Sequence, residues 1–187
     1  MTKLYIATRI ITFFGAWLRT FWEHLACRIC KIPVEDIRPF RADELCGHIE
    51  HSLVEKRNHA FFVSWFPFTM NFILACAFLL TGSYRIFYLG DYGTLSAYIF
   101  LWLGISCAAN CAPAFEDVLS FKDFFYGKGK NVFLKIIVSP FYAVFCGSSV
   151  LEQYSLTFLM SIAFAVVFPK IFNLAFPLIV KAIQFFV

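Results

Sequence analysis

The sequence predicts an all-α membrane protein, a single-domain polytopic bundle of about four or five transmembrane helices. Three observations favour this class. Hydrophobic residues make up 60% of the 187 positions and charged residues only 15%, whereas soluble domains hold about half and about a quarter. The 26 phenylalanines suit a surface that faces lipid. Two long runs carry no charge at all.

The first of these runs, residues 60–82, is the clearest span, because its 23 positions can cross ~30 Å of hydrocarbon at ~1.5 Å per residue. The second run follows after a short turn, so the two are expected to form an antiparallel hairpin. Two later apolar runs predict further spans, and prolines and a lysine then predict a helix along the membrane surface. The predicted spans are 60–82, 94–114, 131–151 and 155–168, followed by an interfacial helix at 170–187.

Residues 1–32 predict a first helix that contains two cations, Arg9 and Arg19. Such a helix can lie in a membrane only if both side chains snorkel or face protein. Its early charges do not fit a cleaved signal peptide, and Pro33 is expected to end it. Residues 33–59 form the main polar segment, where prolines, a glycine and mixed charge predict short strands and loop.

Lysine and arginine are distributed unevenly between the connecting segments. Seven lie in residues 19–59 and four in residues 115–135, but only Arg85 lies in the turn 83–93. Because short cytoplasmic segments are enriched in these residues, we expect 19–59 and 115–135 to lie in the cytoplasm. The predicted location is therefore the cell membrane, with several crossings of the chain.

Two carboxylates, Glu116 and Asp117, follow the apolar run 94–114. At the end of a span, such acids can be a metal ligand or a proton carrier. They can also be a polar cap at the interface, paired with lysines such as Lys122 and Lys128. The residues around them do not decide between these alternatives.

Histidine and cysteine supply a second set of candidate ligands. A C-x2-C pair is followed after fifteen residues by C-x-H, which together give four ligands of the kind that zinc prefers. Alternatively, the first two thiols are small apolar residues of a helix, and the histidines are ordinary polar residues of a loop. Seven cysteines, an odd number, do not indicate a disulfide framework. The candidate metal ligands are His24, Cys27, Cys30, Cys46, His48, His51 and Asp117.

Two short segments resemble the site-2-protease-like family of zincin-type membrane metallopeptidases, over roughly residues 10–150. The segment PFTMNFILA, with Pro67 and Asn71, resembles the opening of the second family span. The segment NCAPAFED, with Asn110 and Pro113, resembles the third family element. The resemblance implies that Asp117 is the acidic zinc ligand and that the two asparagines line the cleft.

The first family motif, HExxH, is degraded in this chain. Its positions fall on Arg19, Thr20, Phe21, Trp22 and Glu23, so both histidines and the glutamate are absent from their places. Hydrolysis needs two imidazoles one helical turn apart and a carboxylate beside them, and arginine cannot bind a metal. The resemblance therefore implies the scaffold without the activity or a cofactor. It also suggests that Arg19 pairs with Asp117 in place of the metal.

The leading functional prediction is a non-catalytic pseudoprotease that binds or regulates, with the lipid bilayer and another transmembrane segment as partners. A second possibility is a zinc-dependent membrane hydrolase with relocated ligands such as Glu23, His24 and Asp117. A third is a small structural or transport membrane protein. Nothing in the composition indicates a nucleic-acid partner.

Overall fold

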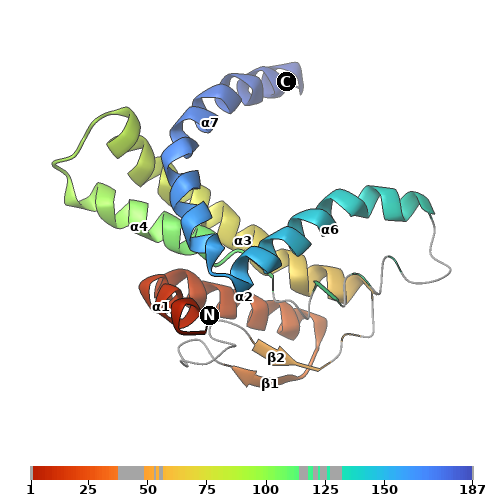
Figure 1. Ribbon diagram of the computed structural model, residues 1–187. Helices are drawn as coiled ribbons and strands as arrows, with labels where there is room; N and C mark the ends of the chain where they lie inside the picture. Colours follow the sequence, from red (N-terminus) through yellow and green to blue (C-terminus); the bar gives the residue numbers. More distant parts are fainter. Residues whose placement is uncertain are drawn as a thin grey trace.

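The computed structural model describes residues 2–37, 49–52, 54, 57–113, 118–119, 122, 126 and 132–186. Over these residues the chain is mostly helical, with one small antiparallel sheet (Figure 1). The helices are α1 (Thr2–Ile11), α2 (Phe13–Cys30), α3 (Arg57–Ser83), the π-helix η1 (Tyr84–Tyr88), α4 (Leu95–Ala109), α6 (Val132–Gln153) and α7 (Leu156–Phe186), and the strands are β1 (Val34–Ile37) and β2 (Ile49–His51).

Three helical stretches of the described chain are long and apolar enough to cross a membrane. They are His59–Tyr88 in α3 and η1, Lys135–Glu152 in α6 and Leu156–Pro177 in α7. This confirms the predicted helical class with long apolar helices. The predicted span 94–114 is shorter than expected, because α4 has only 15 residues. A helix of that length covers about 22 Å, less than the ~30 Å of a hydrocarbon core.

Helix α2 runs antiparallel to α3. Trp22 lies against Phe66, while Phe14, near the start of α2, lies against Phe78, farther along α3. Helix α3 also packs extensively against α4, and α2 touches α4 as well. The N-terminal helix thus packs against the α3–α4 hairpin that the sequence predicted.

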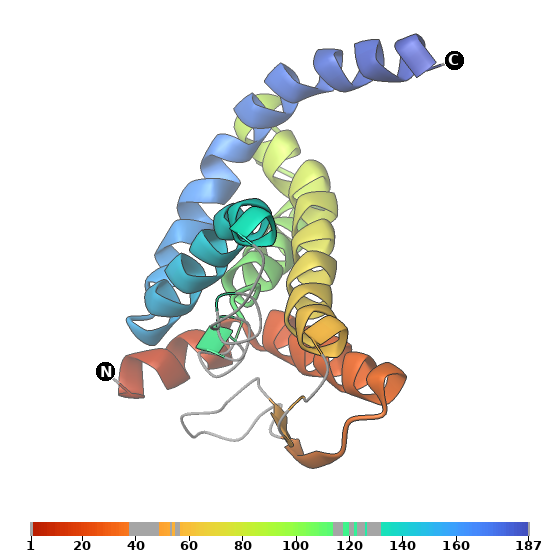
Figure 2. The same cartoon turned by 90° about the vertical axis from the view of Figure 1, so that its right-hand side faces the viewer.

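Helices α6 and α7 follow different halves of α3. Trp65 contacts Phe141 of α6, with 5.1 Å between ring centroids, and Phe72 contacts Phe164 of α7 at 6.0 Å. Farther along, Phe145 of α6 contacts Phe68, and Phe172 of α7 contacts Tyr84 just beyond α3, so both helices run in the same general sense as α3. Their junction lies beside α1, where Glu152 pairs with Arg9 (Figure 2). If α6 and α7 were two successive full crossings of a bilayer, they would run antiparallel to each other, and this arrangement differs from that.

Helix α7 is one continuous helix of 31 residues, although the sequence predicted a break after Phe168. It contains Pro169 and Pro177 and bends along its length (Figures 1 and 2). Proline lacks an amide hydrogen and its ring clashes with the carbonyl four residues earlier, so a bend is the usual result. The bend carries the C-terminal end away from the rest of the molecule (Figure 2).

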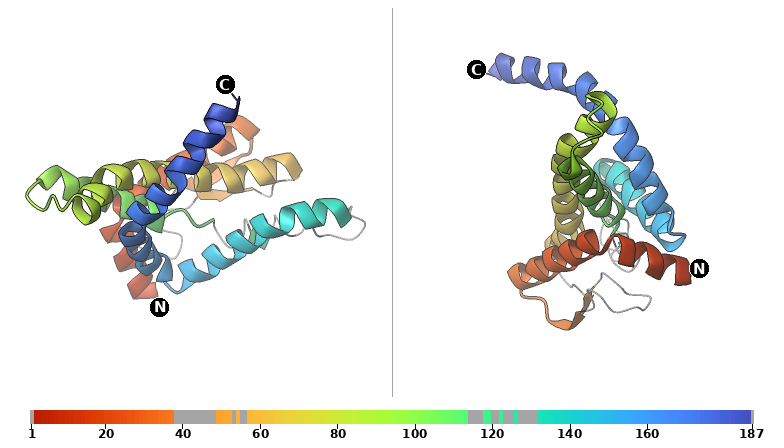
Figure 3. Two further views of the ribbon diagram at one scale, coloured as in Figure 1. Left: turned by 90° about the horizontal axis from the view of Figure 1, so that it is seen from above. Right: turned by 90° about the vertical axis from the view of Figure 1, so that its left-hand side faces the viewer.

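The short strands predicted in the polar segment are present. Strands β1 and β2 pair antiparallel, with Asp36 opposite Glu50 and an irregular register between Val34 and Asp36. The sheet lies near the C-terminal end of α2, away from the free end of α7 (Figure 3).

Candidate functional site: a buried polar cluster

Helix α2 turns its small and polar side chains toward the protein and its large apolar ones outward. Phe13, Trp17 and Phe21 are 44–47% exposed. This pattern is the reverse of that in a soluble helix, and it satisfies the alternative in which the cations of the first helix face protein. The buried residues are Gly15, Ala16, Arg19, Thr20, Glu23, Ala26 and Cys27.

The N-terminal helix is interrupted at Thr12, between α1 and α2. The amide of Gly15 donates to Ser106 Oγ at 2.8 Å, and the carbonyl of Ile11 accepts from Trp102 Nε1 at 3.1 Å. In a continuous helix these two backbone groups would bond to each other. Side chains of α4 therefore replace the helical hydrogen bond that the interruption opens, and neither backbone group is left without a partner.

Three residues of α4 and its C-cap, Trp102, Ser106 and Asn110, are spaced four apart and so share one helix face. We call them the α4 stripe. Besides the contacts above, Ser106 Oγ donates to the carbonyl of Thr12 at 2.9 Å. The amide nitrogen of Asn110 donates to the same carbonyl at 3.2 Å and to Thr12 Oγ1 at 2.9 Å. The stripe thus holds the backbone on both sides of the interruption.

Close approach of α2 to α4 requires glycine at position 15. A Cβ atom there would lie 2.0 Å from the carbonyl oxygen of Ser106 and 2.9 Å from the side-chain nitrogen of Asn110. The first of these atoms belongs to the backbone and cannot rotate away. Gly15 is therefore the point at which the two helices are in direct backbone contact.

Asn71 connects this cluster to α3. Its side-chain nitrogen donates to the carbonyl of Gly15 at 3.2 Å and to the carbonyl of Asn110 at 2.9 Å, and the residue is fully buried. Within the described chain, its Oδ1 has no hydrogen-bond partner. Because Asn71 lies well inside the apolar stretch His59–Tyr88, the cluster lies near the middle of the longest apolar helix rather than at either end.

Arg9 of α1 joins the cluster to the C-terminal end of α6. Its Nη1 donates to Asn110 Oδ1, and its Nη2 forms an ion pair with Glu152. The Tyr5 ring lies 5.0 Å from the guanidinium carbon. The side chains of Arg9 and Glu152 are only 4% and 7% exposed. Charges buried this deeply persist only when they are paired and hydrogen-bonded.

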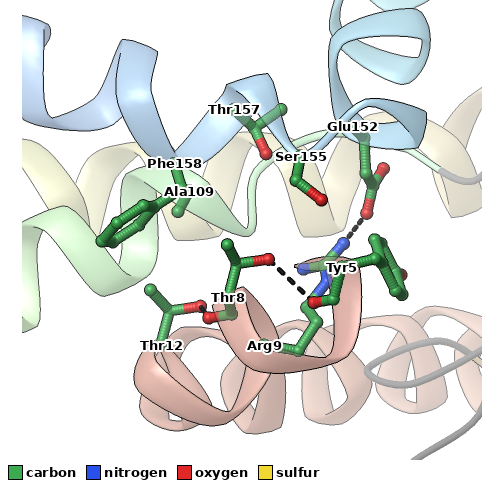
Figure 4. Close-up of a pocket in the computed structure, with 9 residues that line it drawn as sticks. All are labelled: Tyr5, Thr8, Arg9, Thr12, Ala109, Glu152, Ser155, Thr157 and Phe158. Carbon is green, nitrogen blue, oxygen red and sulfur yellow. Dashed lines mark hydrogen bonds and ion pairs between the residues drawn. The ribbon is translucent and has the colours of Figure 1, made fainter. Parts of the chain in front are cut away.

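A small pocket that is partly open to the outside adjoins this ion pair (Figure 4). Arg9 enters from α1, while Glu152 reaches toward it from the end of α6. Ser155, in the α6–α7 junction, has a left-handed backbone at φ 58°. The site can therefore offer hydroxyl groups and one balanced pair of charges. Its lining residues are Tyr5, Thr8, Arg9, Thr12, Ala109, Glu152, Ser155, Thr157 and Phe158.

The structure brings together two of the cleft residues that the resemblance implied, Asn71 and Asn110. It does not test the predicted contact between Arg19 and Asp117, because residue 117 lies outside the described residues. Arg19 itself is buried on the face of α2 that is turned toward the protein.

Thr20 and Glu23, which stand at the glutamate and second-histidine positions of the degraded motif, are buried on the same face of α2 as Arg19. The Thr20 hydroxyl donates to the carbonyl of Ala16 at 3.1 Å. Both side chains therefore point into the protein, as ligands of an interior site would. Neither belongs to the hydrogen bonds that surround Asn110.

The candidate metal ligands lie in several environments. Cys27 is buried with Ala26 and Val63 in an apolar cluster between α2 and α3, and Cys30 borders that cluster. This environment matches the alternative in which the two thiols are small apolar residues. His24 is half-buried on α2.

His51 lies on β2, where its Nδ1 is 3.0 Å from the carbonyl of Ser52. Cys46 and His48, like Asp117, lie outside the described residues. Among the residues that the structure does place, no three His, Cys, Asp or Glu side chains gather closely enough to hold a metal ion.

Sequence reasoning missed most of the polar cluster. Arg9 was recognised only as a charge that needed cover, and Thr12, Ser106 and Glu152 were not singled out as site residues. A usable signal was present, because Arg9 and Glu152 are isolated charges beside long apolar runs and are opposite in sign. Their pairing depends on tertiary structure.

This chain matches no protein-family model, no curated protein and no solved structure, so any assignment of function depends on the geometry of the polar cluster.

Proposed function

We propose that this chain is a multi-pass membrane protein that binds a segment of another membrane protein without cleaving it. The observation that supports the proposal is the meeting of several interrupted helices at one buried polar cluster. The break at Thr12 and the end of α4 at Asn110 meet beside Asn71 of α3, and the α6–α7 junction joins them through the pairing of Glu152 with Arg9. Irregular backbone at membrane depth is tolerated only where protein or a cavity satisfies it, and polar groups there usually have a function.

The absence of hydrolysis in this proposal follows from the degraded motif. Arg19 and Thr20 stand where the family resemblance implies a histidine and a glutamate, and Arg19 is a permanent cation. Because Arg19 is buried, a permanent positive charge stands inside the protein at the position where the resemblance implies a zinc ligand. Without two imidazoles and a general base, the scaffold can bind but cannot activate water.

Transport is the second candidate, and the helix interruptions favour it. Many transporters place their substrate site near the bilayer midplane, between helices whose backbone is broken there. The unpartnered Oδ1 of Asn71 would then accept a hydrogen bond from a solute. This reading predicts movement of a solute across vesicles, which a binding protein does not produce.

The test uses the full chain reconstituted in lipid vesicles. Labelled helical peptides that span the bilayer are added, binding is measured by energy transfer, and mass spectrometry looks for cleavage. We expect saturable binding, intact peptides and no stoichiometric zinc in the purified protein. Lack of binding by every peptide would overturn the proposal. Cleavage, with one equivalent of zinc lost on Asp117→Ala, would establish the hydrolase instead, and solute flux would establish transport.

The multi-pass arrangement is tested separately by cysteine labelling. In a background without native cysteines, single cysteines replace Arg28, Gly93 and Lys122, and a reagent that cannot cross membranes is applied to intact cells. We expect Gly93→Cys to react from outside and the other two variants to react only after the cells are opened. Equal labelling of all three positions would exclude this topology.

A further inference from the structure

We propose that Arg9 is the recognition point for an acidic side chain on the partner segment, and that Glu152 occupies this position while the protein is free. The inference depends on the proposed function, because it names the chemistry of the same partner. The inference gives a role to Arg9 and Glu152, neither of which belongs to the degraded zinc motif.

Arg9 is held in one orientation before any partner arrives. Asn110 Oδ1 accepts from its Nη1, and the Tyr5 ring lies 5.0 Å from its guanidinium carbon. Asn110 is itself fixed, because its amide group donates to both oxygens of Thr12. A preorganised guanidinium binds a carboxylate with little loss of side-chain freedom.

Glu152 comes from an element that is separate from the rest of the cluster. It lies in the last turn of α6, directly before the junction that carries the left-handed Ser155. The C-terminal half of α6 also has outward-facing side chains, with Val144 53% and Val150 41% exposed. A shift of this end of α6 would remove the carboxylate from Arg9 and leave Asn110 and Thr12 in place.

The pocket lining supplies polar partners for the displaced carboxyl group. Thr8, Ser155 and Thr157 line it, so hydroxyl groups lie close to the present position of Glu152 (Figure 4). Hydroxyl groups can donate to a carboxylate or accept from a protonated one. A partner carboxylate at Arg9 would therefore replace one ion pair by another, rather than leave the guanidinium alone in an apolar surrounding.

The depth of the site favours a protein side chain over a lipid phosphate. Arg9 bonds to Asn110, which in turn bonds to Asn71, well inside the apolar stretch of α3. Phosphates lie about 15 Å from the centre of a bilayer with a ~30 Å hydrocarbon core. A glutamate or aspartate at the middle of a membrane-spanning helix reaches the level of Arg9 directly.

The experiment compares three helical peptides of one length that differ at one central position, which is glutamate, glutamine or leucine. Their affinities for the wild-type protein, Arg9→Gln, Glu152→Gln and the control Arg85→Gln are measured in vesicles. Arg85→Gln also removes a cation from an ion pair, but from the exposed pair with Asp91. We expect the wild type and the control to prefer the glutamate peptide several-fold.

The two site variants break the same ion pair and should act in opposite directions. Arg9→Gln is expected to abolish the preference for glutamate, whereas Glu152→Gln should strengthen glutamate binding several-fold because the internal competitor is gone. A general loss of folding would weaken binding in both. Equal binding of all three peptides, or a change in the same direction in both variants, would overturn this inference alone. If no peptide binds to any variant, the proposed function fails with it.

Discussion

Ser106 bonds to the main chain on both sides of the break in the N-terminal helix. Its hydroxyl accepts from the amide of Gly15 at 2.8 Å and donates to the carbonyl of Thr12 at 2.9 Å. One side chain on α4 therefore holds the interruption open, and the neighbouring members of the α4 stripe bond to the remaining groups. The break is a product of tertiary packing, and its strength can be measured.

Replacing Gly15 by alanine should destabilise the protein by about 1–3 kcal/mol or more, because the new methyl group would overlap the backbone of α4. Gly147→Ala is the matched control, since a Cβ at that helical position meets nothing within 4 Å. It should leave stability unchanged or raise it by up to about 1 kcal/mol. Thermal or denaturant unfolding in detergent measures both. Equal effects of the two substitutions would contradict the close approach at Gly15.

Ser106→Ala should cost about 1–3 kcal/mol, because it leaves the buried amide of Gly15 without an acceptor. Hydrogen exchange should also become faster at the break, over residues 11–16. Ser148→Ala is the control, because that hydroxyl donates only to the carbonyl of Phe145 in its own helix. Unchanged exchange at the break in Ser106→Ala would show that the α4 stripe does not hold it.

The turn before α4 should be sensitive to acid. The hydroxyl of Thr94 donates to both oxygens of Asp91, and Arg85 pairs with Asp91 at 2.6 Å. The hydrogen bond from Thr94, followed by Arg85, lowers the pKa of Asp91 below its usual range. A lowered pKa in the folded protein means that the stabilisation is present above the unfolded pKa and is lost as pH falls through the folded one.

Asp91→Asn is the variant that tests this pH dependence. The difference in melting temperature between wild type and variant should be largest near neutral pH and should close as the pH falls below the ordinary range of aspartate, about pH 4. The measurement is a series of thermal melts from pH 7 to pH 3. A difference that stays constant over this range would mean that ionised Asp91 does not stabilise the turn.

Substituting both prolines of α7 by alanine should straighten that helix. Pro169 and Pro177 lie inside α7 and each removes a helical hydrogen bond, and the helix is bent (Figure 1). Spin labels at the exposed positions Leu159 and Gln184 should then lie several ångströms farther apart by pulsed paramagnetic resonance. The doubly labelled protein that retains both prolines is the reference. An unchanged distance would assign the bend to packing instead.

The helical elements were largely predictable, because they depend on composition and length. The uncharged run 60–82 lies within α3 (Arg57–Ser83), and the strands expected in the polar segment are present. The early end of α4 is not visible in hydrophobicity alone, although Pro113 is a local signal for it, because the residue before a proline disfavours helical backbone. Asn110 ends α4 because it bonds to Thr12 and Arg9.

The site was predicted only in part, because its contacts join segments that are far apart in the sequence. Asn71 and Asn110 were chosen by resemblance and do lie together. The break at Thr12 has no proline or glycine at its position, so no local signal marks it, and its hydrogen bonds are supplied from α4. The pairing of Arg9 with Glu152 joins residues separated by most of the chain, which no sequence window covers.

That separation also bears on how the chain is made. Arg9 emerges from the ribosome well before Glu152, which follows only when the end of α6 is translated. In the proposed membrane arrangement, the first helix therefore cannot reach its final position early. Chains that stop before α6 ends would contain a buried cation without its counter-ion, which gives a quality-control protease a physical mark of an incomplete protein.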